Sequence, residues 1–154
     1  MGIQTSAAST SRDDTAQIAA LMQQAGRAFQ AGKFDRLAAI LEQVLEINPD
    51  HTGALYNRGI LHRDKNELYG AEMCFRRALK LDPDMIDAYQ ALGDLLFNVK
   101  HLLPAAKIYE LALERAPNHL PLLHNLAKAR LMLKDAEQTE ALARKILTID
   151  DRSV

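Results

Sequence analysis

Three prolines stand at equal intervals in this chain of 154 residues, at positions 49, 83 and 117. Because 83 − 49 and 117 − 83 both equal 34, the segments that precede the prolines align without insertion or deletion. Self-similarity at a period of about 20–50 residues is typical of stacked supersecondary units, and a period of about 34 indicates a helix–turn–helix unit. The spacing therefore predicts a repeat array, in which each unit buries its apolar face against its neighbours.

Counting back from each proline defines the repeat frame. Repeats fall at 18–51, 52–85 and 86–119, and continuing the frame gives a fourth at 120–153. Residues 1–17 precede the frame and are rich in serine and threonine, so we expect a flexible polar leader there. Proline disfavours the helical conformation in the residue before it, so each second helix should end before its proline. The frame predicts eight helices of about 14 residues, which depend on their neighbours for stability.

Side-chain size agrees between repeats at positions 34 residues apart. One column holds only small residues, which let a neighbouring helix approach closely: Ala25, Gly59, Gly93 and Ala127. Two apolar columns are expected to lie in the core: Leu41, Phe75 and Tyr109 in the first, which shrinks to Ala143 in repeat four, and Leu45, Leu79, Leu113 and Leu147 in the second. Spacings of three and four residues between such positions within a repeat indicate amphipathic helices.

Repeats two and three resemble the tetratricopeptide repeat family. In repeat two the signature positions hold Leu55, Gly59, Ala71, Phe75, Ala78 and Pro83. In repeat three they hold Tyr89, Leu92, Gly93, Leu96, Ala105, Tyr109, Ala112 and Pro117. Repeats one and four depart from the pattern at Gln24, Ala28, Arg130 and Asp151. The resemblance implies an all-α helix-turn-helix solenoid of four repeats, wound as a right-handed superhelix, with the first helices on the concave side and the second helices on the convex side.

Some side chains of each first helix face away from the expected core. Several are large and apolar, which favours a surface that a partner covers. The predicted peptide-binding residues are Met22, Gln23 and Phe29 in repeat one, Tyr56, Asn57, Ile60 and Arg63 in repeat two, Gln90, Asp94 and Phe97 in repeat three, and His124, Asn125 and Lys128 in repeat four. The alternative interpretation is that these side chains pack against an adjacent helix or against the leader.

One column of this face is rich in carboxamides. Gln23, Asn57 and Asn125 share it, and only Ala91 interrupts it. A carboxamide has both a donor and an acceptor, as a peptide main chain requires of its partner. In similar arrays this column holds an extended peptide, so we expect Asn57 and Asn125 to do so here. The pockets for its side chains would be formed by Tyr56, Ile60 and Phe97.

A variant of the family grips the acidic C-terminal tail of heat-shock chaperones with lysine, arginine and asparagine side chains. The matching positions here hold Met22, Gly26, Asn57, Asp87 and Ala91. Only the asparagine is retained, so such a tail is not expected to bind.

Composition narrows the classes of partner. With 19 basic and 20 acidic residues the net charge is −1, which favours neither nucleic acid nor an anionic membrane. No apolar run approaches the roughly 18 residues of a membrane-spanning helix. The five histidines are scattered and the chain has one cysteine, so we expect no metal, no cofactor and no enzymatic activity. A single cysteine is consistent with a reducing, cytoplasmic location.

The sequence thus predicts a non-catalytic protein–protein interaction scaffold that binds a peptide or protein segment in a concave groove. Two alternatives stay open: a secretion-type chaperone that holds an unfolded client, and a self-assembling or regulatory module of a larger enzyme complex. The second alternative includes a homo-oligomer formed through an uncapped C-terminal helix, which carries Leu142, Ile146 and Ile149.

Overall fold

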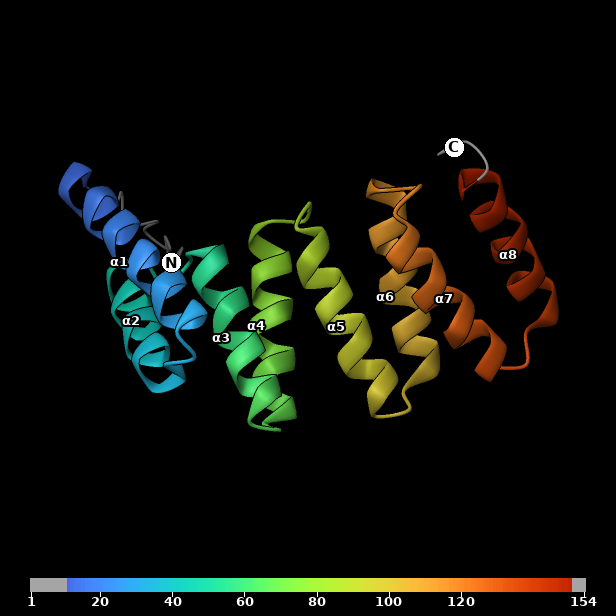
Figure 1. Cartoon of the computed structure of the whole chain (residues 1–154), viewed down its shortest axis with the longest axis horizontal. Helices are drawn as coiled ribbons and strands as arrows, with labels where there is room; N and C mark the ends of the chain where they lie inside the picture. Colours follow the sequence, from blue (N-terminus) through green and yellow to red (C-terminus); the bar gives the residue numbers. More distant parts are fainter. Residues whose placement is uncertain (1–10, 151–154) are drawn as a thin grey trace, which may run out of the picture.

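The computed structural model describes residues 11–150, and throughout this range the regular structure is helical. Neighbouring helices run antiparallel along a single row (Figure 1). This arrangement confirms the predicted all-α solenoid of helical pairs. In the described range the helices are α1 (Arg12–Gln30), α2 (Phe34–Ile47), α3 (Thr52–Asp64), α4 (Leu68–Leu81), α5 (Ile86–Asn98), α6 (Leu102–Arg115), α7 (Leu120–Met132) and α8 (Ala136–Asp150).

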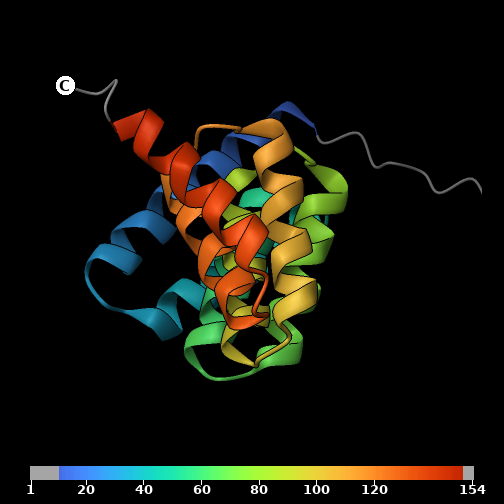
Figure 2. The same ribbon diagram turned by 90° about the vertical axis from the view of Figure 1, so that its right-hand side faces the viewer.

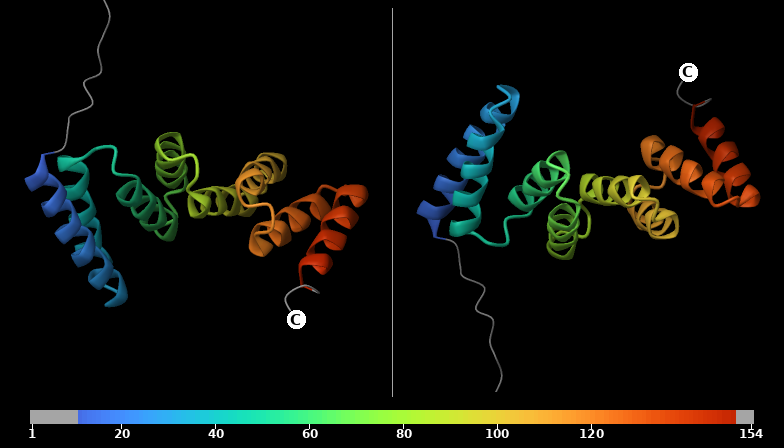
Figure 3. Two further views of the ribbon diagram at one scale, coloured as in Figure 1. Left: turned by 90° about the horizontal axis from the view of Figure 1, so that it is seen from above. Right: turned by 90° about the horizontal axis from the view of Figure 1, so that it is seen from below.

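Each helix packs against the next one in the chain, and the first helices of repeats two to four also meet. α3 contacts α5, and α5 contacts α7. Viewed from above and below, the pairs follow one another from α1 and α2 at one end to α8 at the other (Figure 3). The end-on view looks along this row with α8 nearest (Figure 2). The first helices of repeats two to four therefore lie side by side and can present one continuous surface.

The turn between the two helices of a repeat has the same backbone geometry four times. A residue with φ between 60° and 66° ends each first helix: Gly32, Asn66, Lys100 and Lys134. The N–H of the residue after it donates back to the helix, from Lys33 to Ala28 at 2.9 Å and from Glu67 to His62 at 2.8 Å. This is the Schellman motif, which favours glycine or asparagine at its left-handed position. The last two repeats place lysine there instead.

The predicted boundary of the leader is corrected by α1. This helix begins at Arg12, so residues 12–17 are helical, while residues 1–10 of the predicted leader lie outside the described residues. The Ser11 hydroxyl accepts a hydrogen bond from the Asp14 N–H at 3.1 Å, and the Asp14 carboxylate accepts one from the Ser11 N–H at 2.9 Å. This reciprocal capping box satisfies two N–H groups that a helix start leaves free, so α1 begins there.

Buried side chains form two clusters, and α3 lies between them. One cluster joins α1 and α2 to Ala54 and Leu61 of α3. The other extends from α4 to α7, and Tyr56 and Ile60 of α3 pack against it. The first repeat thus has a core of its own, connected to the rest of the array through opposite sides of one helix.

The column of small residues makes room for the aromatic rings. A β-carbon at position 59 would lie 2.6 Å from Cε1 of Phe75, and one at position 93 would lie 2.4 Å from Cε1 of Tyr109. Both rings are fully buried, with 0% and 1% exposure. A β-carbon at either position would crowd the ring, because optimal carbon–carbon contacts are about 3.5–4.0 Å.

Two core positions predicted for α8 are wrong. Leu147 is 62% exposed, and Ala143 is also exposed. Leu79 and Leu113 occupy the same column as Leu147 in the preceding repeats. Both pack against a cluster that includes the first helix of the following repeat. α8 is the last described helix, so nothing in residues 11–150 plays that part for Leu147.

Arg130, which departs from the family pattern, pairs with two carboxylates. Its guanidinium pairs with Glu110 of α6, and its Nη1 lies 3.3 Å from Oδ2 of Asp135, just before α8. These ion pairs connect α7 to α6 and to the turn before α8, where an apolar residue would have packed.

Candidate binding face

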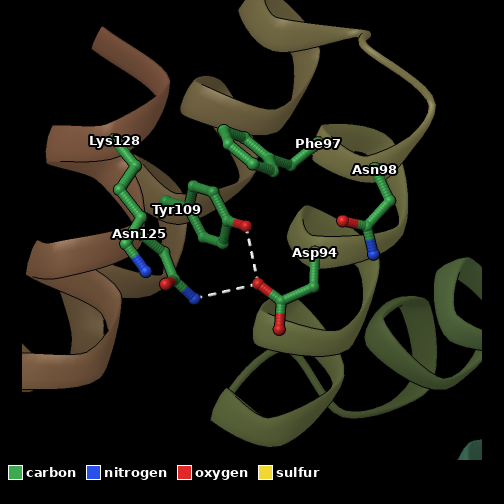
Figure 4. A pocket seen from close by; sticks show the side chains of 6 residues that line it. All are labelled: Asp94, Phe97, Asn98, Tyr109, Asn125 and Lys128. Atoms are coloured by element: carbon green, nitrogen blue, oxygen red, sulfur yellow. Dashed lines mark hydrogen bonds between the residues drawn. The ribbon is translucent and has the colours of Figure 1, made fainter. Parts of the chain in front are cut away.

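Four of the predicted binding residues line one cavity of about 270 Å³. These four residues lie on α5 and α7. Two further residues, one on α5 and one on α6, complete the lining (Figure 4). The lining consists of Asp94, Phe97, Asn98, Tyr109, Asn125 and Lys128. We call the side of α1, α3, α5 and α7 that carries the predicted residues the first-helix face, and this cavity opens on it.

A hydrogen-bonded trio holds one wall of the cavity. The Tyr109 hydroxyl donates to Oδ1 of Asp94 at 2.6 Å, and Nδ2 of Asn125 donates to the same oxygen at 2.9 Å (Figure 4). Tyr109 reaches this point because its ring lies over Gly93, the residue before Asp94. Oδ2 of Asp94 and Oδ1 of Asn125 have no hydrogen-bond partner within residues 11–150. The trio thus fixes two acceptors at the cavity.

The tyrosine hydroxyl is a donor in this trio. Burial, together with the hydrogen bond to Asp94 and the charge of Asp94, raises the pKa of the Tyr109 phenol well above its usual range. The hydroxyl therefore keeps its proton at neutral pH and always acts as the donor. A hydrogen bond from a phenol to a carboxylate is charge-assisted, and such bonds are shorter and stronger than those between neutral groups.

The predicted residues of α3 divide between core and surface. Tyr56 and Ile60 pack against the buried cluster, and the ring of Tyr56 lies 5.9 Å from that of Phe75. Burial raises the pKa of Tyr56, and the negative charge of Asp87 on α5 raises it further. Asn57 is half-buried and has no hydrogen-bond partner in the described part of the chain. Its carboxamide is therefore free to bind a ligand.

The charged and polar residues around these helices are mostly engaged locally. Arg63 pairs with the adjacent Asp64 at 2.9 Å. His124 is exposed, and its Nδ1 lies 2.9 Å from the carbonyl oxygen of Leu120, one turn earlier. Gln90 is half-buried, one turn before Asp94 on α5.

The structure does not bring the predicted residues of α1 to the Asp94 cavity. Met22 packs against the cluster of the first repeat. Gln23 lines a different cavity, together with Arg27 and other residues of α1 and α2. Phe29 is 56% exposed and contacts Phe34 of α2 edge-on, with ring centroids 6.3 Å apart. The carboxamide column is thus continuous only from α3 to α7, where buried Ala91 separates Asn57 from Asn125.

Sequence reasoning missed Tyr109 and Asn98. Tyr109 belongs to a column of large buried residues, and its ring is indeed buried. The signal was its hydroxyl, because a buried tyrosine normally needs a partner for that group, whereas Leu41 and Phe75 in the same column do not. Asn98 carried no comparable signal, since it lies at the end of α5 outside the repeated columns.

Other kinds of site find no support in the described part of the chain. Residues 11–150 contain no group of three histidine, cysteine, aspartate or glutamate side chains placed to hold a metal ion. None of the helices in that range combines the length and the apolar character needed to cross a membrane.

Comparison with known families identifies the repeats. Residues 53–85 and residues 86–119 each match a family model described as tetratricopeptide repeat. These ranges correspond to repeats two and three. Human protein O-mannosyl-transferase TMTC3 is 34% identical over 90 residues, which is 58% of this chain. The match covers only 10% of the length of that transferase.

Solved structures share the fold. The crystal structure of MamA superimposes with a TM-score of 0.81 at 17% identity, covering 88% of this chain and 80% of that one. The first repeat domain of Spaghetti (RPAP3), bound to the HSP90 peptide SRMEEVD, gives a TM-score of 0.70 at 24% identity, covering 76% and 95%. At these identities the likeness establishes the fold.

Proposed function

Because the chain belongs to the tetratricopeptide repeat family, we propose that it is a non-catalytic scaffold that binds a peptide or protein segment on its first-helix face. The observation that carries the proposal is the trio of Asp94, Tyr109 and Asn125. It holds the Asn125 carboxamide at a cavity and leaves its oxygen available. A side chain fixed before binding loses less conformational entropy when a ligand arrives.

Two carboxamides serve the ligand main chain. Asn57 on α3 and Asn125 on α7 flank α5, and both are half-buried with acceptor groups that no residue in the range 11–150 uses. An extended segment that crosses α5 would present its N–H and C=O groups to both. Phe97, which lines the same cavity as Asn125, would contact an apolar side chain of the ligand.

The charge of α5 selects against an acidic ligand. Asp87 and Asp94 lie two turns apart on this helix, and neither pairs with a cation within the described residues. The peptide bound by Spaghetti carries two glutamates and an aspartate in its printed sequence. We expect the ligand of this chain to be neutral or basic where it crosses α5, because like charges brought together are destabilising.

The transferase name of one relative does not extend to this chain. The matched region is a tenth of that protein, and here it coincides largely with the repeats. We therefore propose binding without catalysis, in the cytoplasm, where a lone cysteine such as Cys74 would stay reduced.

The test is selection followed by calorimetry. Peptides selected from a random display library on the immobilised protein are titrated against wild type, Asn57→Ala and Asn125→Ala. Each substitution should weaken binding by about 1 kcal/mol, because one net hydrogen bond is lost. Gln43→Ala is the matched control, since Gln43 is an exposed carboxamide on α2, away from the first-helix face.

The outcomes separate clearly. Weaker binding by both asparagine variants, with Gln43→Ala unchanged, supports the proposal. Unchanged affinity in both asparagine variants would remove the first-helix face as the binding surface.

Self-association is a second candidate, because one large apolar side chain of α8 is uncovered. Leu147 is 62% exposed. Light scattering at tens of micromolar, compared with Leu147→Glu, tests it. A wild-type monomer at that concentration contradicts self-association.

A further inference from the structure

The second helices of repeats two and three carry large apolar side chains on their outer surface. On α4, Tyr69 is 78% exposed and Met73 is 50% exposed, and on α6 Leu103 is 65% exposed. Views from above and below show α4 and α6 on the same side of the row (Figure 3). These helices lie opposite the first-helix face, so the binding proposed above does not cover them.

Two cavities flank α4 on this side. One of about 510 Å³ is lined by Leu103, Pro104, Ile108 and Leu111 of α6, by Leu96 of α5 and by Arg76 of α4. The other, of about 520 Å³, is lined by residues of α4 that include Met73 and Leu81, and by Asp50, which precedes α3. Arg76 borders both cavities.

The charged groups at these cavities are mainly cations. Arg76 pairs with Glu72 at 2.8 Å, and Arg77 pairs with Asp50 at 2.9 Å. The remaining two cations are lysines, one at each cavity: Lys80 and Lys107. Neither forms an ion pair within residues 11–150. Each cavity therefore combines an apolar lining with one unpaired lysine, in a chain whose net charge is −1.

We propose that this α4–α6 surface is a second binding site, for an acidic amphipathic helix of another protein. Apolar side chains of that helix enter the two cavities, and its carboxylates pair with Lys80 and Lys107. The two unpaired lysines favour a partner segment with negative charge. The apolar linings favour a segment that also has an apolar face, as an amphipathic helix does. The site does not depend on the first-helix face.

The same features argue against an anionic membrane or nucleic acid as the partner. Either would be held by many cations, whereas only two remain after the arginines pair with Glu72 and Asp50. A phosphate backbone also has no apolar groups that could fill the two cavities.

The test uses a fluorescein-labelled amphipathic helical peptide with leucine on one face and glutamate on the other. Its control has lysine in place of every glutamate. Binding to the full chain is followed by fluorescence anisotropy up to about 1 mM peptide. NMR amide shifts report which helices respond, and phosphatidylserine vesicles test the membrane alternative. Circular dichroism melting confirms that each variant is folded.

We expect the glutamate peptide to bind and to shift the amides of α4 and α6. Leu103→Glu should weaken binding about tenfold or more, because the apolar contact that Leu103 makes with the bound peptide is lost. Lys107→Glu should weaken it about fivefold. Leu131→Glu is the matched control on the first-helix face, since Leu131 is 64% exposed, and it should leave the affinity unchanged.

Several results would overturn the proposal. These are no binding at about 1 mM, equal binding of the lysine peptide, amide shifts confined to α3, α5 and α7, or binding of vesicles alone. Because Asn57→Ala and Asn125→Ala should not affect this peptide, failure of one site is distinguishable from failure of the other.

Discussion

Replacing Gly93 by alanine tests the close approach on which the site is built. A β-carbon at this position would lie 2.4, 2.7 and 2.9 Å from three ring carbons of Tyr109. The ring is 1% exposed and cannot move into solvent without opening the core. It must therefore shift against its neighbours, and the shift also disturbs the 2.6 Å hydrogen bond from its hydroxyl to Asp94.

The expected loss of stability follows from three terms. Overpacking a buried contact typically costs about 1–3 kcal/mol. Weakening the hydrogen bond to Asp94 adds about 1 kcal/mol, and the higher helix propensity of alanine returns about 1 kcal/mol. The net destabilisation is about 1–3 kcal/mol, which for a chain of this size lowers Tm by about 3–9 °C.

Gly26→Ala is the matched control. Gly26 also lies within a helix, but a β-carbon there would have no atom within 4 Å. Only the propensity term remains, so stability should rise by about 0.5–1 kcal/mol. Urea unfolding followed by circular dichroism measures both variants. If Gly93→Ala is as stable as wild type, or shifts in the same direction as Gly26→Ala, the steric reasoning is refuted.

Three further variants probe the turn, the trio and a cap. Lys134→Gly should stabilise the fold by about 0.5–1 kcal/mol in urea unfolding, because lysine there has a φ of 60°; no gain would contradict left-handed strain. Tyr109→Phe should cost about 1–2 kcal/mol by the same assay, and equal stability would mean that its hydroxyl contributes nothing. Nδ1 of His51 accepts from the Ala54 N–H at 3.0 Å, and burial lowers the pKa of His51 below its ordinary 6.5. The unfolded chain therefore binds more protons, and stability should fall as pH drops from 6.5 through the folded pKa. His51→Asn, measured by thermal melts at several pH values, should flatten this fall; an unchanged slope would contradict it.

The repeat period predicted the helical pairs and most of the core, because both depend on residue size and spacing alone. Phe75 and Tyr109 are buried where the columns placed them. The exposure of Leu147 could not be derived in this way, because burial of that column also requires a following helix. The start of α1 was missed although Ser11 and Asp14 form a recognisable cap, since the frame was counted from prolines and not from capping residues.

The binding face was less predictable than the fold. Asp94 and Asn125 are 31 residues apart, and only the stacking of α5 on α7 brings them to one hydrogen bond. The pattern placed both on the same face but gave no information on which side chains engage each other. Tyr56 and Ile60 illustrate the reverse case, because the packing of α3 draws them partly into the core.

The division of the core at α3 has a consequence for measurements of binding. Since α1 and α2 are held by a separate cluster, this terminal pair can open without exposing the cluster that extends from α4 to α7. A short ligand seated between α5 and α7 would then slow amide hydrogen exchange only in the later repeats. A ligand long enough to reach α1 would slow exchange at both ends together, so the span of protected amides measures how much of the array a partner occupies.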